Sequence, residues 1–208
     1  MTLLDRAELA EDVLRAAVRL LGCTLSADTP EGTVSVRLVE VEAYRGADDP
    51  ASHSFRGRTP RNAVMFGPPG HVYVYFTYGM HWCMNLVCGP EGRASAVLLR
   101  AGEVVEGAPL ATRRRPTAKT PRELARGPAR LTLALGVDGS QDGLDATDPS
   151  SPLTVSMPAG TRAGEVLHGP RVGVAGDGAV HPWRFWLAGE PSVSAYRPAV
   201  SRRRPDRG

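Results

Sequence analysis

Alternating hydrophobic and polar residues predict several strands along the chain. The valine-rich segment Thr33–Tyr44 and the segment Ala94–Ala101 both have the composition and period of strands. Two further runs, Val72–Thr77 and His81–Leu86, are separated by a short segment that contains Tyr78-Gly79, which favours a β-hairpin with Tyr78 at or near its tip. Shorter strands are predicted towards the C-terminus, at residues 153–157, 170–176 and 181–189.

Apolar residues at helical spacing predict two helical regions. In residues 6–21 one apolar stripe is formed by Leu9, Val13, Ala16, Ala17, Leu20 and Leu21. Gly22 is suited to end this helix. Residues 120–137 resume the helical pattern, with Thr120-Pro121 and Gly127-Pro128 as start signals and Gly136 as a stop signal.

A long polar connection lies between the strand that ends at Tyr44 and the predicted hairpin. Residues 45–70 are rich in Gly, Pro, Asp and Ser and exceed an ordinary connection, and loops of this length are usually functional or disordered. No internal repeat or linker divides the chain. We therefore predict a single domain, residues 1–208, with residues 202–208 as a frayed tail.

The composition fits one compact core. The chain has 208 residues, of which 42% are hydrophobic. No apolar run approaches the ~20 residues that span a bilayer, and the N-terminus is acid-rich and periodic, unlike a secretory signal. We expect an intracellular, cytoplasmic protein with no membrane contact. The net charge is only +3, but a pI near 9.0 and the arginine clusters at 113–115 and 202–204 permit nucleic-acid binding without requiring it.

The cysteines and histidines do not predict a metal centre. Three cysteines without a CxxC pair argue against a disulfide framework and a structural zinc site, so we expect reduced thiols. His81 and Cys83 share a strand face but have no fourth ligand nearby. The segment Gly67–Gly70 lacks the pattern of a phosphate-binding loop and is interpreted as a turn. We predict no metal and no cofactor.

Two groups of residues could carry chemistry. Glu40 and Glu42 lie two residues apart at the end of a strand, on one face if no bulge intervenes, and Tyr44 follows them. Tyr73 and Tyr75 share one face of the first hairpin strand, opposite an apolar face. Taken singly, the two glutamates are more typical of ordinary edge or solvated residues. Tyr73 or Tyr75 alone fits cross-strand packing as well as it fits a binding site.

Their combination favours a nucleotide site. An aromatic slot beside an ionised carboxylate can hold a planar heterocycle and activate water next to it. A large ring at a hairpin tip, such as Tyr78, can fill the gap that an extruded base leaves in DNA. His53, in the long loop, is either part of this site or an ordinary surface residue.

The motifs EAY, TPRN, YVYxxYGMxxCMN and LLRA, in this order, resemble the signature of the alkyladenine (3-methyladenine) DNA glycosylase family. Later segments, "LARGPARLTLALGV", "PRVGV" and "RFWLAGEPSVS", are similar to the same family, so the resemblance extends from about Leu20 to Tyr196. It implies a mixed α/β (α+β) fold, with a curved, mainly antiparallel sheet, surrounding helices and a protruding β-hairpin. It also implies a base-excision-repair enzyme that acts, as a monomer, on double-stranded DNA containing damaged purines.

The resemblance implies a role for each matching residue. Glu42 would be the general base that activates water, and Arg100 and the backbone carbonyl of Val172 would help to hold that water. The base pocket would consist of Tyr44 and Tyr75 on the two faces of the flipped purine, His53 at its edge and Asn85 at the floor, where it would exclude guanine. The residues that contact DNA would be Tyr78 as the intercalating wedge, Met80 beside it, and Gly127 and Arg130 at the backbone.

The implied reaction is simple hydrolysis that leaves an abasic site, because the motifs contain no lysine or amine nucleophile. Expected substrates are 3-methyladenine and 7-methylguanine, with hypoxanthine and ethenoadenine as further candidates. Two other classes remain open at this point. A non-catalytic DNA-binding module would not need Glu42, and a hydrolase of free nucleosides would not need Tyr78.

Overall fold

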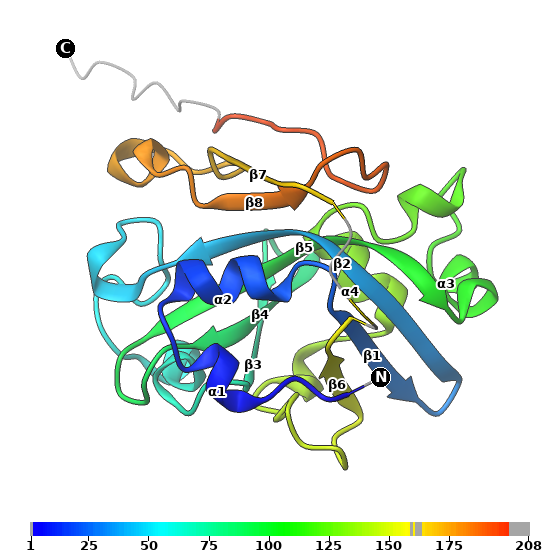
Figure 1. Ribbon diagram of the computed structural model, residues 1–208, viewed down its shortest axis with the longest axis horizontal. Coiled ribbons are helices and arrows are strands. Elements are labelled where there is room, and N and C mark those ends of the chain that lie inside the picture. The colour runs from blue at the N-terminus through cyan, green and yellow to red at the C-terminus, as the bar shows by residue number, and fades with distance from the viewer. Residues whose placement is uncertain (1, 159, 161–163, 200–208) are drawn as a thin grey trace.

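The computed structural model describes residues 2–158, 160 and 164–199. The predicted tail at residues 202–208 lies outside these residues. Eight strands form one sheet, and six of them follow the order β3-β4-β5-β2-β1-β6 (Figure 1). Strand β8 pairs with β2 and with β7. All these pairings are antiparallel. The strands are β1 (Thr24–Thr29), β2 (Gly32–Tyr44), β3 (Val72–Thr77), β4 (His81–Cys88), β5 (Ser95–Glu106), β6 (Leu153–Ser156), β7 (Val166–Gly169) and β8 (Arg184–Leu187). The predicted mixed α/β fold with a mainly antiparallel sheet is confirmed.

Short helices pack around this sheet. They are α1 (Arg6–Leu9), α2 (Val13–Leu20), α3 (Ala108–Arg114) and α4 (Pro128–Leu135), with 3-10 turns η1 (Gly46–Asp48), η2 (Pro60–Phe66), η3 (Pro121–Glu123), η4 (Gly139–Gln141) and η5 (Gly176–Val180). Helix α2 packs on β2 and β5, and α4 packs on β4 and β5. The apolar stripe predicted for residues 6–21 is buried and forms part of the main core.

Two sequence-based expectations are wrong. Residues 6–21 form two helices rather than one, because the carboxylate of Asp12 accepts a hydrogen bond from the backbone N–H of Leu14 and caps a new helix. The strand predicted at residues 170–176 is absent, and β7 lies just before it. Arg171 is fully buried and the backbone N–H of Val172 is directed to a side chain, so this segment does not form a ladder. Strand β1 and helix α3 were not predicted.

A pair of β-bulges decides what each face of the sheet carries. In the β2–β5 register, Leu38 pairs with Gly102 and Glu40 with Ala101, which leaves Val39 as an extra residue on β2. Before Val39 the even-numbered residues of β2 face the main core, and from Val39 on the odd-numbered ones do. Glu40 and Glu42 are thereby turned to the opposite face, away from the hydrophobic core.

Candidate active site

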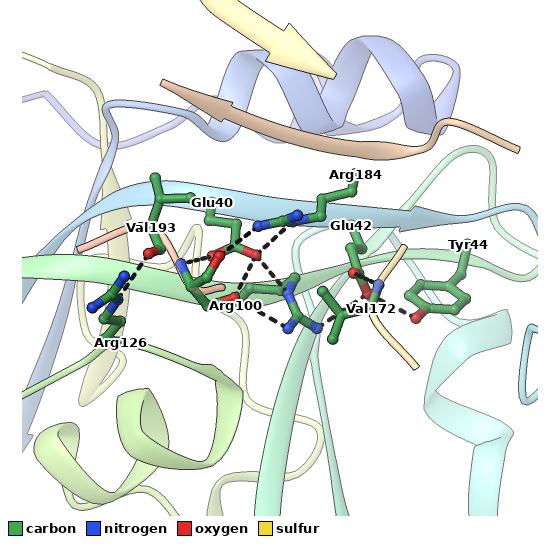
Figure 2. Close-up of polar contacts among 9 residues, drawn as sticks. Glu40, Glu42, Tyr44, Arg100, Arg126, Val172, Arg184 and Val193 are labelled. Atoms are coloured by element: carbon green, nitrogen blue, oxygen red, sulfur yellow. Dashed lines mark hydrogen bonds and ion pairs between the residues drawn. The ribbon is translucent and has the colours of Figure 1, made fainter. Parts of the chain in front are cut away.

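The second bulge places Arg100 beside the two glutamates. Glu40 pairs with Ala101 and Val41 with Leu99, so Arg100 is the extra residue on β5. Its Nε donates a 2.8 Å hydrogen bond to Glu40, and its Nη1 lies 3.3 Å from Oε2 of Glu42 (Figure 2). Bulges next to functional sites commonly re-aim a side chain in this way.

A row of register partners continues the same face across four strands. Tyr73 pairs with Asn85, Asn85 with Leu98, and Leu98 with Glu42. Side chains directly opposite one another on neighbouring strands lie on the same face. The sheet therefore aligns the tyrosine strand β3 with the carboxylate strand β2, although they are distant in sequence.

Glu42 is completely buried and strongly held. Its Oε1 accepts a 2.7 Å hydrogen bond from the backbone N–H of Val172, and its Oε2 accepts one of 2.9 Å from the hydroxyl of Tyr44. Burial raises the pKa of Glu42, and the charge of Arg100 opposes this rise without cancelling it. The contact with Val172 is made by its amide, whereas the resemblance implied a role for its carbonyl.

Tyr44 and Tyr75 remain neutral phenols. Burial, and then the carboxylate of Glu42, raise the pKa of Tyr44 well above its ordinary value, and burial likewise raises the pKa of Tyr75. The hydroxyl of Tyr44 is therefore a donor to Glu42, and Tyr44 also lines a pocket. The guanidinium of Arg171 lies 4.5 Å from the centre of this ring.

A small pocket of about 70 Å³ is bounded by aromatic rings, one of which belongs to Tyr44, the hydrogen-bond partner of Glu42. Its lining residues are Tyr44, Ala51, His53, Met65, Tyr73, Tyr75 and Asn85. The rings of Tyr73 and Tyr75 stack at 5.5 Å, and the ring of His53 meets Tyr75 edge-on at 4.5 Å. All four residues predicted for the base pocket are brought together here.

The long loop is ordered around Asn62 of the TPRN motif. The Asn62 side chain donates hydrogen bonds of 3.0 Å to the carbonyls of His53 and Gly57, and it also forms a capping box with Thr59. Burial, and then the charge of Arg61, lower the pKa of His53. His53 is thus a neutral imidazole at physiological pH, with Nδ1 at 3.2 Å from the hydroxyl of Tyr73.

The hairpin β3–β4 ends in an exposed aromatic residue. Tyr78 is 87% exposed and Met80 is 69% exposed. Tyr78 is the only non-glycine residue in the described ranges with a positive φ, 51°, and it precedes Gly79 at 65°. A bulky residue in this conformation is strained, and such strain is often found at functional sites.

Gly127 and Arg130 lie apart from the pocket, at the start of α4. Gly127 is the N-cap, with φ of 122°, no side-chain cap and open space beyond its Cα, and Arg130 is exposed. Helix α4 is tied to the hairpin strand β4 by a 2.9 Å hydrogen bond from the hydroxyl of Thr132 to the carbonyl of Trp82. Helix and hairpin are therefore close neighbours.

Several residues of the site were given no role in it from the sequence. Tyr73, Ala51 and Met65 line the pocket. Tyr73 has a signal, because it shares a strand face with Tyr75, but Ala51 and Met65 lie in the long loop and have none. Arg184 and Ser194 surround Glu40 and come from the C-terminal part of the chain.

The structure adds three observations on other features of the chain. In the described part of the chain no three or more His, Cys, Asp or Glu side chains gather where a metal ion could be held. No described helix is long and apolar enough to cross a membrane. Cys23, Cys83 and Cys88 are buried, and none of them forms a disulfide bond.

Comparison with known proteins identifies the family. The model of the methylpurine-DNA glycosylase (MPG) family matches residues 7–191. A protein of Streptomyces avermitilis named "Putative 3-methyladenine DNA glycosylase" is 59% identical over 204 residues, covering 98% of this chain and 96% of its own. A protein of the same name from Nocardia farcinica is 52% identical, covering 95% of this chain and 93% of its own. Another from Mycobacterium tuberculosis is 49% identical, covering 97% of each chain. The chain therefore belongs to the methylpurine-DNA glycosylase family of DNA-repair enzymes.

Proposed function

We propose that this protein is a monofunctional 3-methyladenine DNA glycosylase, which flips damaged purines out of duplex DNA and hydrolyses the N-glycosidic bond. The observation that carries the proposal is the hydrogen bond between Tyr44 and Glu42. It joins an aromatic pocket to a buried carboxylate of raised basicity. A flipped base in the pocket would bring its glycosidic bond next to this carboxylate.

In the proposed mechanism Glu42 is the general base. A carboxylate has about four acceptor sites. Within the described residues three contacts reach Glu42, from Tyr44, Val172 and Arg100, which leaves a site that can accept a proton from water. Entry of that water requires a local movement, because Glu42 has no exposed surface. Water activated by Glu42 attacks C1′, the C1′–N bond breaks, the purine leaves with the bonding electrons, and an abasic site remains. Arg100 and the Val172 amide orient Glu42 during this step.

The aromatic residues would bind the flipped base. Tyr44 and Tyr75 would stack on it, which is worth ~1 to 3 kcal/mol per base. His53 would contact its edge. Asn85, whose amide donates a 3.2 Å hydrogen bond to the carbonyl of Tyr73, would crowd the exocyclic amine of guanine. Cationic 3-methyladenine and 7-methylguanine are good leaving groups, and hypoxanthine and ethenoadenine are further proposed substrates.

Tyr78 would replace the extruded base in the DNA stack, with Met80 alongside it. The backbone amides at the start of α4, with Arg130, would hold a phosphate. Several exposed arginines and a lysine form no ion pair within the described ranges and are available to bind DNA phosphates. They lie in the segments before and after the hairpin in the sequence. They include Arg56, Arg58, Arg61, Arg93, Arg113, Lys119, Arg122 and Arg130. We expect the protein to act as a monomer. Its substrate, chromosomal DNA, would place it inside the cell.

The test is base release from methylated duplex DNA in the presence of EDTA. Free 3-methyladenine and 7-methylguanine are measured, and the DNA is then treated with alkali. We expect both bases to be released, with strand breaks only after alkali. Tight binding without release would identify a damage-binding module instead, and breaks without alkali would identify a lyase. Equal cleavage of free 7-methylguanosine would favour a nucleoside hydrolase.

A further inference from the structure

A second buried carboxylate lies beside Glu42 and has no part in the reaction described above. Glu40 has no exposed surface and no contact with the aromatic pocket. It is enclosed between β5 and β8, opposite Ala101 and Trp186. A buried charge is costly unless it is fully paired, so its presence calls for an explanation.

The oxygens of Glu40 are engaged by donors from three parts of the chain. Oε1 accepts 2.8 Å hydrogen bonds from Nε of Arg100, Nε of Arg184 and the hydroxyl of Ser194. Oε2 accepts a 2.6 Å hydrogen bond from the backbone N–H of Ser194. Glu40 is therefore an anchor for its neighbours and is not placed to take a proton from water.

Arg100 is shared unequally between the two carboxylates. Its Nε is 2.8 Å from Glu40, whereas its Nη1 is 3.3 Å from Glu42 (Figure 2). The contact with Glu40 is the shorter one, and the charge of Arg100 acts on both carboxylates. Without Glu40, no negative charge of that residue would oppose the charge of Arg100 at Glu42.

The four buried ionic groups balance one another. Glu40 and Glu42 carry two negative charges, and Arg100 and Arg184 carry two positive charges. Arg184 is the register partner of Glu42, but its Nε bonds to Glu40. The charge of Glu40 thus opposes the positive charge that acts on Glu42, in the direction that raises the pKa of Glu42.

We propose that Glu40 is a positioning residue for the glycosylase reaction: it holds Arg100 by the Nε edge and neutralises it in part, which keeps Glu42 basic enough to activate water. This inference rests on the proposed function of Glu42. A full ion pair between Arg100 and Glu42 would leave a weaker base, since an opposite charge within about 4–6 Å favours the ionised form of a carboxyl group.

Four strands, β2, β3, β5 and β8, carry charged and titratable groups near Glu42. Glu40 and Tyr44 belong to β2, Arg100 to β5, Arg184 to β8 and Tyr75 to β3. Both tyrosines stay neutral in the acid range. Of these groups, the two arginines and Glu40 are the ones whose charge can move the titration of Glu42, and Arg171, over the ring of Tyr44, is paired with Asp49.

The test is the pH dependence of single-turnover release of 7-methylguanine from duplex DNA, with enzyme in excess. The charge of this base does not change in the acid range, so the acid limb reports the enzyme. Glu40→Gln keeps the shape and removes the charge. We expect its acid limb to move to lower pH by roughly one unit, with a slower plateau rate because the base is weaker.

Two further variants separate electrostatics from loss of structure. Arg184→Gln removes a positive charge and should move the limb to higher pH. Ser194→Ala removes one hydrogen bond to Glu40 without changing the charge, and should leave the position of the limb unchanged. A limb that stays fixed in Glu40→Gln, or that moves in the same direction in both charge variants, would overturn the proposal. Absence of release by the wild type would instead overturn the proposed function itself.

Discussion

Arg171 donates two hydrogen bonds to Asp49, of 2.6 and 2.8 Å, although the two residues are 122 positions apart and neither side chain is exposed. The same guanidinium donates to the carbonyls of Ala43 and Gly178. Burial alone would raise the pKa of Asp49, but the hydrogen bonds and charge of Arg171 outweigh it and lower that pKa. This pair fastens the segment after β7 to the end of β2, where the active site lies.

Arg171→Met should destabilise the protein by about 3–5 kcal/mol, because it leaves the carboxylate of Asp49 buried without its partner. Urea unfolding followed by circular dichroism measures this change in the free energy of unfolding. Arg113→Met, which alters an exposed arginine, is the matched control and should change stability by less than about 0.5 kcal/mol. Equal stability of the two variants would show that the buried pair contributes little.

Tyr78, the proposed wedge, should show a conflict between stability and activity. Tyr78→Gly relieves a positive φ and should stabilise the fold by about 1 kcal/mol. Tyr78→Ala keeps that strain, and both variants should weaken flipping by a few kcal/mol at most. Release is compared on duplex and single-stranded substrates, with Tyr196→Ala as an exposed-tyrosine control. Wild-type rates on duplex DNA in both Tyr78 variants would refute the wedge role.

Asn85→Ala should relax the exclusion of normal guanine. Removing the side chain opens space at the pocket floor, and a gain of roughly tenfold in guanine release is expected from a steric contact of this kind. Alkali-labile sites at guanines in undamaged duplex DNA measure the effect. The double variant with Glu42→Gln should produce none, since the same base is needed. An Asn85→Ala enzyme that still ignores guanine would remove Asn85 from the specificity argument.

The pH profile should report the buried carboxylate. Only ionised Glu42 can accept a proton, and burial raises its pKa above the ordinary value of 4.5. Single-turnover release of 7-methylguanine should therefore fall as the pH decreases, with a midpoint above 4.5. A midpoint at or below that value would mean that Arg100 and the hydrogen bonds dominate over burial, or that another group limits the rate.

Local patterns were sufficient for much of the fold. The alternation in β2, β3 and β4, and the proline and glycine signals of α4, predicted these elements because each depends on short-range spacing. The strand predicted at residues 170–176 is wrong because Arg171 and Val172 bond to β2 and the loop that follows it. Such long-range contacts leave no periodic signal.

The two glutamates show the limit most clearly. Spacing could place Glu40 and Glu42 on one face, but it could not choose between them, nor show that both are buried. The bulges at Val39 and Arg100 re-aim both glutamates and bring Arg100 between them. The two glutamates then differ in their contacts, because Glu42 bonds to Tyr44 of the pocket, whereas Glu40 is held by Arg184 and Ser194. Bulges depend on the register of two strands and are not visible in either strand alone.

The central claim is that Glu42 is the general base. Glu42→Gln, measured in single-turnover release of 7-methylguanine from duplex DNA with EDTA present, tests it most directly, with the exposed glutamate variant Glu103→Gln as the matched control. The account predicts a loss of roughly 10²- to 10⁴-fold in rate with unchanged affinity for lesion-containing duplex, and a near wild-type rate for the control. Release by Glu42→Gln at the wild-type rate would contradict it.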